Sequence, residues 1–325
     1  MSEAVAVPAR ASRRLSLSQE WLLALALVVL FLVVGLINPR FLAMRNLQTV
    51  LLGNAYIAVA AIGMTMVIVS GNIDISVGSL IGVLATVSGS LAVAGVPSVL
   101  AWLVPVVLSM MVMTLQGALV AYLGIPSIVV TLGMLSILKG GLISVTNGVW
   151  ISNLPDGYHL AQWSMFGLVP APVAFMVLLT VLAAWWMRNT AAGRSIYAVG
   201  GNAEAARLCG IEREGTVMMV FAIHGLFVGL AAVLFATQLS VIQSTVPANL
   251  ELTIITASVV GGVSILGGTG TAIGSTLAAV LIAAIGSSLV FINLSPFWLR
   301  AVQGVLILAT VLADIYRRRR RGLAR

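Results

Sequence analysis

The chain has 325 residues, of which 60% are hydrophobic and only 8% charged, and its mean hydropathy is +1.13. This composition excludes a water-soluble globular protein and indicates a polytopic membrane protein. The net charge of +8 does not point to nucleic acid, because most arginines flank apolar runs and there set membrane orientation. The single cysteine, Cys209, excludes an internal disulfide, and we expect it to be a small filler on a loop helix.

A polar tail, residues 1–20, precedes the first apolar run, Trp21–Ile37. We expect the tail to be cytoplasmic and to have no fold of its own. The run is longer than a usual signal-peptide core, and no small-x-small cleavage site follows it. We therefore interpret it as a retained membrane span.

The apolar runs predict an all-α polytopic protein with about ten transmembrane helices, within a membrane domain over residues 21–315. Two of the runs, 77–94 and 252–267, are short enough to be tilted, broken or re-entrant. A basic tail, residues 316–325, follows the domain. The predicted spans are 21–37, 50–70, 77–94, 99–122, 127–147, 165–187, 216–238, 252–267, 271–292 and 297–315.

The basic residues are concentrated in both tails and in the loop after the sixth span. An even number of spans places these three segments on one side of the membrane, and the positive-inside rule makes that side cytoplasmic. Those in the three segments are Arg10, Arg13, Arg14, Arg188, Arg194, Arg207, Arg213, Arg317 to Arg321 and Arg325. Those elsewhere are Arg40, Arg45, Lys139 and Arg300.

The longest charged segment between apolar runs is Arg188–Thr216. Within it, Asn202–Leu208 has the pattern of a short amphipathic helix, with Asn202 as N-cap and Gly210 as stop signal. A helix this short is marginal alone, so it should pack on neighbouring spans or on a partner subunit. A solvated loop with one helical turn is the alternative.

Polar residues interrupt the apolar runs at Ser70–Ser79, with Asp74 in the middle. A carboxylate inside a membrane should be paired or face water. We favour Asp74 as a cap for the third span, with Ser76 also near its free amide groups. A proton or substrate site is the alternative.

Neutral polar side chains in the other spans could bond a polyhydroxylated solute or join helix to helix. Lys139 could reach such a pathway or extend to the membrane interface. His159 and His224 have no metal-binding spacing, and we expect each to pack and to form hydrogen bonds, with no metal or cofactor. The pathway candidates are Asn54, Asn72, Asp74, Ser76, Gln116, Thr131 and Asn147.

A weak internal repeat links the segment Ser70–Ser79 to a glycine-rich stretch, Gly261–Gly274. Gly-Lys-Ser and Gly-Lys-Thr are both absent from the sequence, so this stretch is no nucleotide-binding P-loop, and close helix packing explains its glycines. The segment Gly148–Ser164 could be an ordered external cap or a plain interfacial loop. The repeated residues are Gly71, Gly78 and Ser79, matched by Gly267, Gly274 and Ser275.

Three motifs occur in order, namely SGNIDISVGS at 70–79, AGRSIYAVGGNAEAARLCGI at 192–211 and GGVSILGGTGTAIG at 261–274. With them the chain resembles the permeases of monosaccharide ABC importers of the ribose and xylose type, over residues 38–314. The residues of the first motif and of GVWISNLP at 148–155 are most similar to those of the branch serving rhamnose and autoinducer-2. Asn72 departs from the glycine that most members have there.

The resemblance implies a multi-pass protein of the bacterial inner membrane with both termini cytoplasmic. It would pair with a second permease copy or paralogue, and receive a monosaccharide or small polyol from a periplasmic sugar-binding protein. ATP hydrolysis would occur on a separate cytoplasmic ATPase, so this chain would not itself be an enzyme. An ion-coupled secondary carrier using Asp74, or a scaffold that only recruits a partner, would be the rival functions.

The resemblance also assigns a role to the central loop, residues 188–215, as the segment that couples to the ATPase. The docking candidates are Gly193, Arg194, Gly200, Asn202, Glu204, Ala205, Arg207 and Gly210.

Overall fold

A computed structural model of the chain describes residues 19–160, 163–165 and 169–320, with side chains up to Tyr316. The predictions for Arg10, Arg13 and Arg14, and for the side chains of the C-terminal arginines, lie outside these residues. The two short strands pair antiparallel. The elements are α1 (Gln19–Ile37), η1 (Pro39–Leu42), α2 (Met44–Val69), α3 (Val77–Val93), α4 (Ser98–Ala121), α5 (Ser127–Thr146), η2 (Asp156–Tyr158), β1 (Ser164–Met165), β2 (Val169–Pro170), α6 (Ala171–Asn189), α7 (Ala191–Gly201), α8 (Ala203–Leu208), α9 (Arg213–Ala236), α10 (Leu250–Val260), α11 (Ala272–Phe291) and α12 (Trp298–Arg320).

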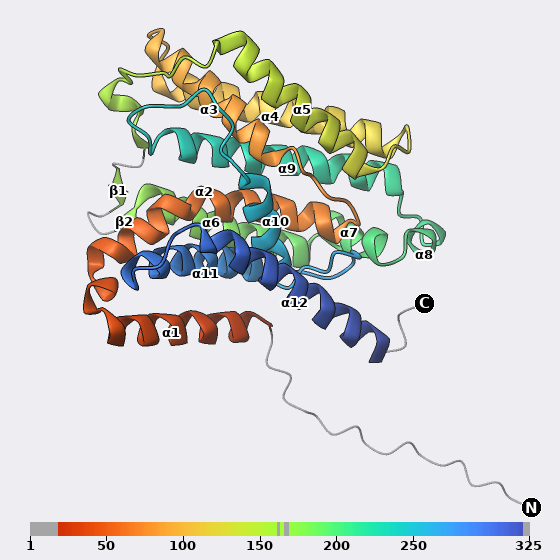
Figure 1. Cartoon of the computed structure of the whole chain (residues 1–325). Helices are drawn as coiled ribbons and strands as arrows, with labels where there is room; N and C mark the ends of the chain where they lie inside the picture. Colours follow the sequence, from red (N-terminus) through yellow and green to blue (C-terminus); the bar gives the residue numbers. More distant parts are fainter. Residues whose placement is uncertain (1–18, 161–162, 166–168, 321–325) are drawn as a thin grey trace, which may run out of the picture.

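Eight of these helices are long and apolar enough to cross a membrane, and α3 and α10 are shorter apolar helices. The predicted all-α polytopic class is therefore confirmed. Most of the helices run side by side, and α8 projects at one end of the bundle, which we call the α8 end (Figure 1). At that end α1 and α9 begin and α2, α6 and α12 finish.

The centre of the bundle is formed by α2 and α9, whose most apolar windows are 78% and 67% buried. By contrast, only 6% of the corresponding window of α12 is buried, and α1 and α5 are similarly exposed. Apolar side chains on such outer helices are expected where lipid or another subunit, rather than water, is the neighbour. Because the corresponding window of α11 is also 61% buried, the burial pattern separates an inner group of helices from an outer layer.

The pair α4 and α9 packs closely because glycines face the partner helix. An added Cβ on Gly225 would lie 2.8 Å from the Cα of Met110, and one on Gly229 would lie 2.6 Å from the Cα of Val106. Glycines four residues apart on one helix face let two backbones approach, which is how membrane helices gain van der Waals contact.

Substituting Gly225 with alanine should therefore destabilise the bundle. The new methyl group would overlap the α4 backbone, and overpacking of this kind costs about 1–3 kcal/mol. We expect a lower thermal unfolding temperature for the detergent-purified protein. Gly133→Ala is the matched control, because no atom of the described chain lies near a Cβ at Gly133 on α5. Equal unfolding temperatures for both variants would contradict this packing.

Three predicted boundaries were wrong. The span predicted from residue 165 begins instead at Ala171, because β1 and β2 form a hairpin there and Pro170 precedes the first helical turn. The span predicted to end at 267 ends at Val260. It is followed by the loop 261–271, which we call the glycine loop, where Gly262, Gly267, Gly268 and Gly270 adopt positive φ angles. The span predicted from residue 50 begins instead at Met44. The last predicted span, 297–315, agrees with the apolar segment Trp298–Tyr316, and its helix continues to Arg320.

Candidate functional site

The segment 70–76, which we call the elbow, joins α2 to α3 without helical structure. Gly71 makes the turn with a φ of +84°, a conformation that favours glycine. One oxygen of Asp74, Oδ1, accepts hydrogen bonds from the backbone N–H and the hydroxyl of Ser76, both at 2.7 Å. Asp74 therefore stabilises the turn immediately before α3. Ser76 occupies the N-cap position itself, without a side-chain capping bond.

The second oxygen of Asp74 lies 3.1 Å from Nε2 of His224, and both side chains are fully buried. His224 is close to the midpoint of α9, so the contact ties the elbow to the centre of the bundle. The other ring nitrogen, Nδ1, has no hydrogen-bond partner among the described residues, and an added Cβ on Gly63 of α2 would lie 2.5 Å from it. As predicted, His224 packs and forms a hydrogen bond, whereas its pairing with Asp74 was not anticipated.

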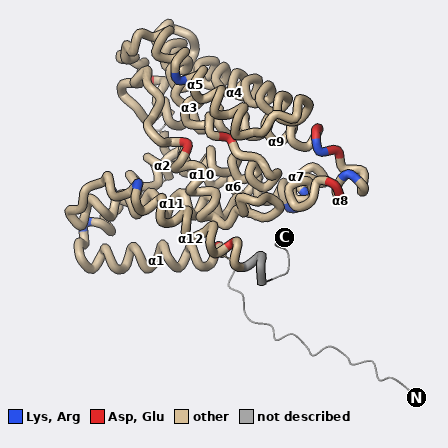
Figure 2. Tube along the Cα trace, turned by 45° about the vertical axis from the view of Figure 1, so that its right-hand side comes forward, with Lys and Arg blue, Asp and Glu red and all other residues tan. Residues whose placement is uncertain are grey.

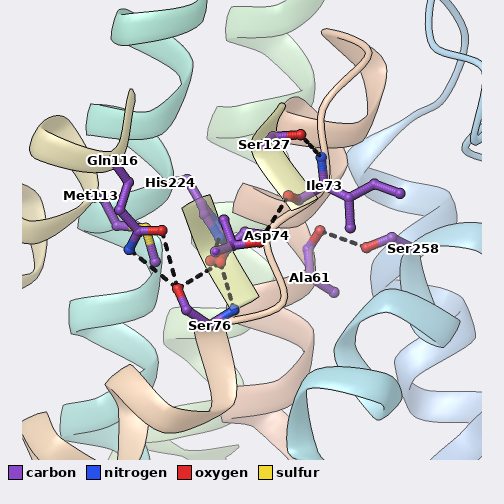
Figure 3. A network of polar contacts seen from close by, with 10 residues as sticks. Ala61, Ile73, Asp74, Ser76, Met113, Gln116, Ser127, His224 and Ser258 are labelled. Carbon is purple, nitrogen blue, oxygen red and sulfur yellow. Dashed lines mark hydrogen bonds and ion pairs between the residues drawn. The ribbon is translucent and has the colours of Figure 1, made fainter. Parts of the chain in front are cut away.

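Several pathway candidates meet around this pair (Figure 3). The amide of Gln116 on α4 donates to the hydroxyl of Ser76 at 3.2 Å, and the hydroxyl of Thr131 on α5 lies 3.5 Å from the carbonyl of Ile73. The side chain of Asn72 remains local and donates to the Ser70 hydroxyl. We call this group the polar cluster. Its members are Asn72, Asp74, Ser76, Gln116, Thr131 and His224, all buried.

The remaining two pathway candidates lie elsewhere. Asn147 ends α5 in the left-handed conformation, with a φ of +51°. Asn54 lines a groove of about 600 Å³ between α2, α10, α11 and α12, in the half of the bundle opposite the α8 end. The polar residues along this groove are Asn46, Thr49, Asn54, Tyr56, Thr253, Ser287 and Gln303.

One carboxylate was missed by the sequence analysis. Glu251 is in the first turn of α10 and partly exposed, and its carboxylate takes part in no ion pair or hydrogen bond within the described chain. Its Oε2 would lie 2.5 Å from a Cβ added to Gly78, which places it beside the first turn of α3. From the sequence, the run from residue 252 was recognised as short enough to be broken or re-entrant, but no prediction was made for Glu251.

The depth of Glu251 follows from its neighbours. Gly78 is four positions from Asp74, which contacts the midpoint of α9 through His224. Two short helices, α3 and α10, thus begin next to each other in the interior of the bundle, each with a carboxylate near its first turn. Facing lipid, a charged side chain at this depth costs about 3 kcal/mol. The exposed part of Glu251 therefore needs water or a partner chain beside it.

The central loop contains two helices, not one. The predicted helix is α8, where the Asn202 side chain accepts from the Ala205 N–H and Gly210 follows the end with a φ of +79°. The additional helix α7 was not predicted, because glycines make Ala191–Gly201 a poor helix by propensity. Thr190 caps it by accepting from the Gly193 N–H.

Two docking candidates are internal. Gly193 is buried against the backbone of Met187, and a Cβ on Gly200 would overlap the carbonyl of Val69 at the end of α2. The exposed candidates are Arg194, Asn202, Glu204, Ala205, Arg207 and Gly210. Figure 2 shows charged residues of both signs gathered along α8 and the turn after it.

The backbone of α7 rests on two other segments. The N–H of Gly268 in the glycine loop donates to the Val69 carbonyl at 2.8 Å, directly beside Gly200. We call the meeting of Val69, Gly200 and Gly268 the glycine contact. Nearby, Tyr197 donates from its hydroxyl to the Gly270 carbonyl at 2.9 Å, and burial raises the pKa of Tyr197, which keeps that donor proton in place. The central loop is thereby fixed to the ends of α2 and α10.

Other sequence expectations were met to different degrees. His159 packs and lies 3.3 Å from the Thr237 carbonyl through Nδ1. Lys139 is exposed on α5, outside the polar cluster. Cys209 is exposed beyond α8, so its prediction as a packed filler was wrong; the short helix ends before it and leaves it outside. The first glycines of the two repeat copies, Gly71 and Gly267, share a similar φ, +84° and +82°.

Comparison with known proteins identifies the class. The profile of a family described as the permease component of a branched-chain amino acid transport system matches residues 46–311. The chain belongs to this permease family. It is 36% identical to the autoinducer 2 import system permease protein LsrC of Salmonella typhi over 290 residues, which are 89% of this chain and 84% of that protein.

Similar figures hold for two further relatives with the same name. The protein of Yersinia pseudotuberculosis serotype O:3 is 35% identical over 91% of this chain and 85% of its own length, and that of Photorhabdus luminescens is 34% identical over 89% and 88%. No solved structure matches the chain. The permease resemblance drawn from the three motifs is confirmed, and the ion-coupled carrier is disfavoured. The chain is a multi-pass inner-membrane permease subunit of an importer.

Proposed function

We propose that this permease passes a monosaccharide or a similar small polyol from a periplasmic binding protein into the cytoplasm, driven by a separate ATPase chain that docks on α8. Both termini and the α8 end would be cytoplasmic. The single observation that supports this best is α8 itself, a helix with exposed charged residues fixed at its base to the membrane helices. The relatives' printed name makes autoinducer 2 one substrate to test.

The surface of α8 is suited to a protein partner. Glu204 and Arg207 form an ion pair at 2.9 Å with 69% and 72% of their side chains exposed, and the apolar side chain of Leu208 beside them is 80% exposed. On the opposite side, buried Ala206 packs against the chain. An exposed leucine with charged neighbours is typical of a protein interface, where a central apolar contact has a polar rim.

Coupling between this surface and the membrane would pass through the glycine contact. The ATPase would bind α8 differently in its two nucleotide states, and such differential binding shifts the permease between its own states. Because Gly200 touches Val69 and Gly268 directly, α7 cannot move without moving the ends of α2 and the glycine loop. These segments lead to the elbow and to α10.

The pathway would use the groove opposite the α8 end. Its amide and hydroxyl groups, such as those of Asn54 and Gln303, bond uncharged hydroxyls without the tight charge pairing that would retain a delivered sugar. The polar cluster is fully buried, so it would instead hold α3, α4, α5 and α9 together. A second permease copy or paralogue would cover the outer helices.

Exchanging the charges on α8 should abolish ATPase binding. The double variant Glu204→Arg with Arg207→Glu preserves an i,i+3 ion pair on the helix but reverses the charge pattern that a partner meets. We expect an affinity pull-down from native membranes to recover an ATPase with the wild type and not with the double variant. Uptake of labelled ribose, xylose, rhamnose and autoinducer 2 should fall in parallel.

The control is Arg45→Glu, at an exposed position in the first turn of α2, at the other end of the bundle. This variant should still recover the ATPase. If the wild type recovers no ATPase in several mild detergents, the proposed function is wrong. If the double variant binds as well as the wild type, α8 is not the docking helix.

A further inference from the structure

We propose that Glu251 borders the translocation pathway and accepts hydrogen bonds from the hydroxyl groups of the passing polyol. This inference rests on the proposed function and adds to it a residue that contributes to substrate specificity. Its basis is the position of one partly exposed carboxylate beside the first turns of α3 and α10, inside the bundle.

The contrast with Asp74 shows why Glu251 is not simply structural. Both carboxylates precede or begin a short helix in the bundle interior. Asp74 is fully buried and all its contacts are made inside the chain, to Ser76 and His224. Glu251 is partly exposed, and no donor among the described residues bonds to it. The hydrogen-bonding capacity of its carboxylate is therefore not used within the described chain.

The surroundings of Glu251 exclude lipid as its neighbour. Ionisable side chains within membrane spans face a water-filled cavity or another protein chain, because hydrocarbon offers no compensation. Gly78 leaves space for the carboxylate against α3, since any Cβ there would meet Oε2 at 2.5 Å and the Glu251 backbone nitrogen at 2.9 Å. The face formed by the starts of α3 and α10 is consequently the face turned toward the pathway.

The groove of about 600 Å³ leads to the same turn. Leu250 and Thr253, in the same first turn of α10 as Glu251, line the groove, whereas Glu251 itself lies beside it against Gly78 of α3. Thr253 accepts a hydrogen bond from Gln303 of α12 at 3.3 Å. A solute entering from the side opposite the α8 end would thus pass neutral amides and hydroxyls before it reaches the carboxylate. Broken helices whose first turns meet within the membrane form the substrate sites of many transporters.

A carboxylate at this position selects hydroxyl-rich solutes. Its two oxygens accept hydrogen bonds and donate none, so they match two neighbouring O–H donors of a sugar. Hydrogen bonds to an ionised acceptor are stronger than those between neutral groups. Replacing one hydroxyl by hydrogen removes such a bond, and a site built to bond a hydroxyl discriminates strongly against the analogue that lacks it.

The first test measures whether position 251 faces water. In a Cys209→Ser background, Glu251→Cys is treated in native membranes with a charged methanethiosulfonate reagent. The control is Val181→Cys near the middle of α6, at a side chain 59% exposed in the chain but expected to face lipid. We expect labelling at 251 to be faster by about tenfold or more, because only a hydrated thiol ionises readily. Equal rates at the two positions would overturn the proposal.

The second test measures how strongly the permease discriminates between a sugar and its monodeoxy derivatives, and it does not depend on the cysteine variant. The complex is given whichever of ribose, xylose or rhamnose it takes up, and each monodeoxy derivative of that sugar. For at least one derivative, the wild type should lose about tenfold or more in transport efficiency. In Glu251→Ala and Glu251→Gln, the ratio of the transport efficiency for the parent sugar to that for the deoxy derivative should fall toward one. An unchanged ratio in both variants would overturn the proposal that Glu251 accepts hydrogen bonds from the substrate hydroxyl groups.

The two tests separate this inference from the proposed function. Labelling in membranes needs neither ATPase nor substrate, so it reports on Glu251 even if no ATPase is recovered with the wild type. Conversely, recovery of an ATPase that depends on α8, together with slow labelling at 251, would leave the importer assignment in place and remove Glu251 from the pathway.

Discussion

Asp74→Ala should leave little folded permease in the membrane. The substitution removes the acceptor for the Ser76 N–H and hydroxyl, and it leaves the buried His224 ring without its only partner in the described chain. Each buried hydrogen-bonding group that is left without a partner costs about 1–3 kcal/mol, and the whole stability of a domain is about 5–15 kcal/mol. The measurements are the yield of monodisperse protein and its thermal unfolding temperature in detergent.

Graded variants show which contact matters. Asp74→Asn keeps an oxygen for Ser76 but offers an amide N–H to His224, which can accept it only if its proton moves to Nδ1. Nδ1 has no partner beside Gly63, so we expect an intermediate loss. His224→Ala should also destabilise, and the double variant should cost less than the sum of the two.

The control for these variants is Asp156→Ala, which removes an exposed carboxylate on η2 and should leave stability unchanged. A different result for Asp74 would be informative. Suppose that Asp74→Ala folded with normal stability and that it abolished an uptake that depends on an ion gradient. Asp74 would then be a coupling site, and an ion-coupled carrier would be the favoured function.

Gly200→Ala should uncouple ATP hydrolysis from transport. A Cβ at Gly200 would overlap the Val69 carbonyl and lie 3.0 Å from the Gly268 nitrogen, so the glycine contact must open. Each segment of the contact would then move separately, while α8 keeps its exposed surface. We expect uptake to fall by about tenfold or more, because the added methyl group would both break the hydrogen bond from the Gly268 N–H to the Val69 carbonyl and overpack the contact. ATPase recovery in the pull-down should persist.

The adjacent glycine provides the matched control. No atom of the described chain lies near a Cβ at Gly201, which is exposed, so Gly201→Ala should transport normally. Both variants add the same methyl group to the last turn of α7, and they differ only in what that group meets. Normal uptake by Gly200→Ala would show that movement passes from α8 to the membrane by another route.

Sequence reasoning predicted what local pattern determines. Apolar run lengths predicted the spans, and the N-cap Asn202 with the terminal Gly210 predicted α8. It failed at α7, because glycines that lower helix propensity are there required for close approach to Val69. That requirement depends on a neighbour distant in sequence, and local propensity contains no information about it.

The candidate site was predictable only in part. Asp74 and Ser76 belong to one turn, so their contact could be foreseen from spacing. His224 is 150 positions away, and no periodicity in so apolar a helix as α9 marks the face that meets Asp74. The position of Glu251 was not predicted, because hydropathy showed only that the run 252–267 is short enough to be broken or re-entrant, and not that its first turn lies beside that of α3.

The glycine contact also restricts when the chain becomes competent for assembly during synthesis. Its three members come from segments far apart in sequence, with Gly268 following Gly200 by the whole of α9 and α10. A nascent chain that has inserted only as far as α9 has α8 but no glycine loop to support it. If a soluble subunit docks on α8 as proposed, its productive engagement would be postponed until α10 and the glycine loop are in place. Truncated or stalled chains would consequently not sequester that subunit in inactive complexes.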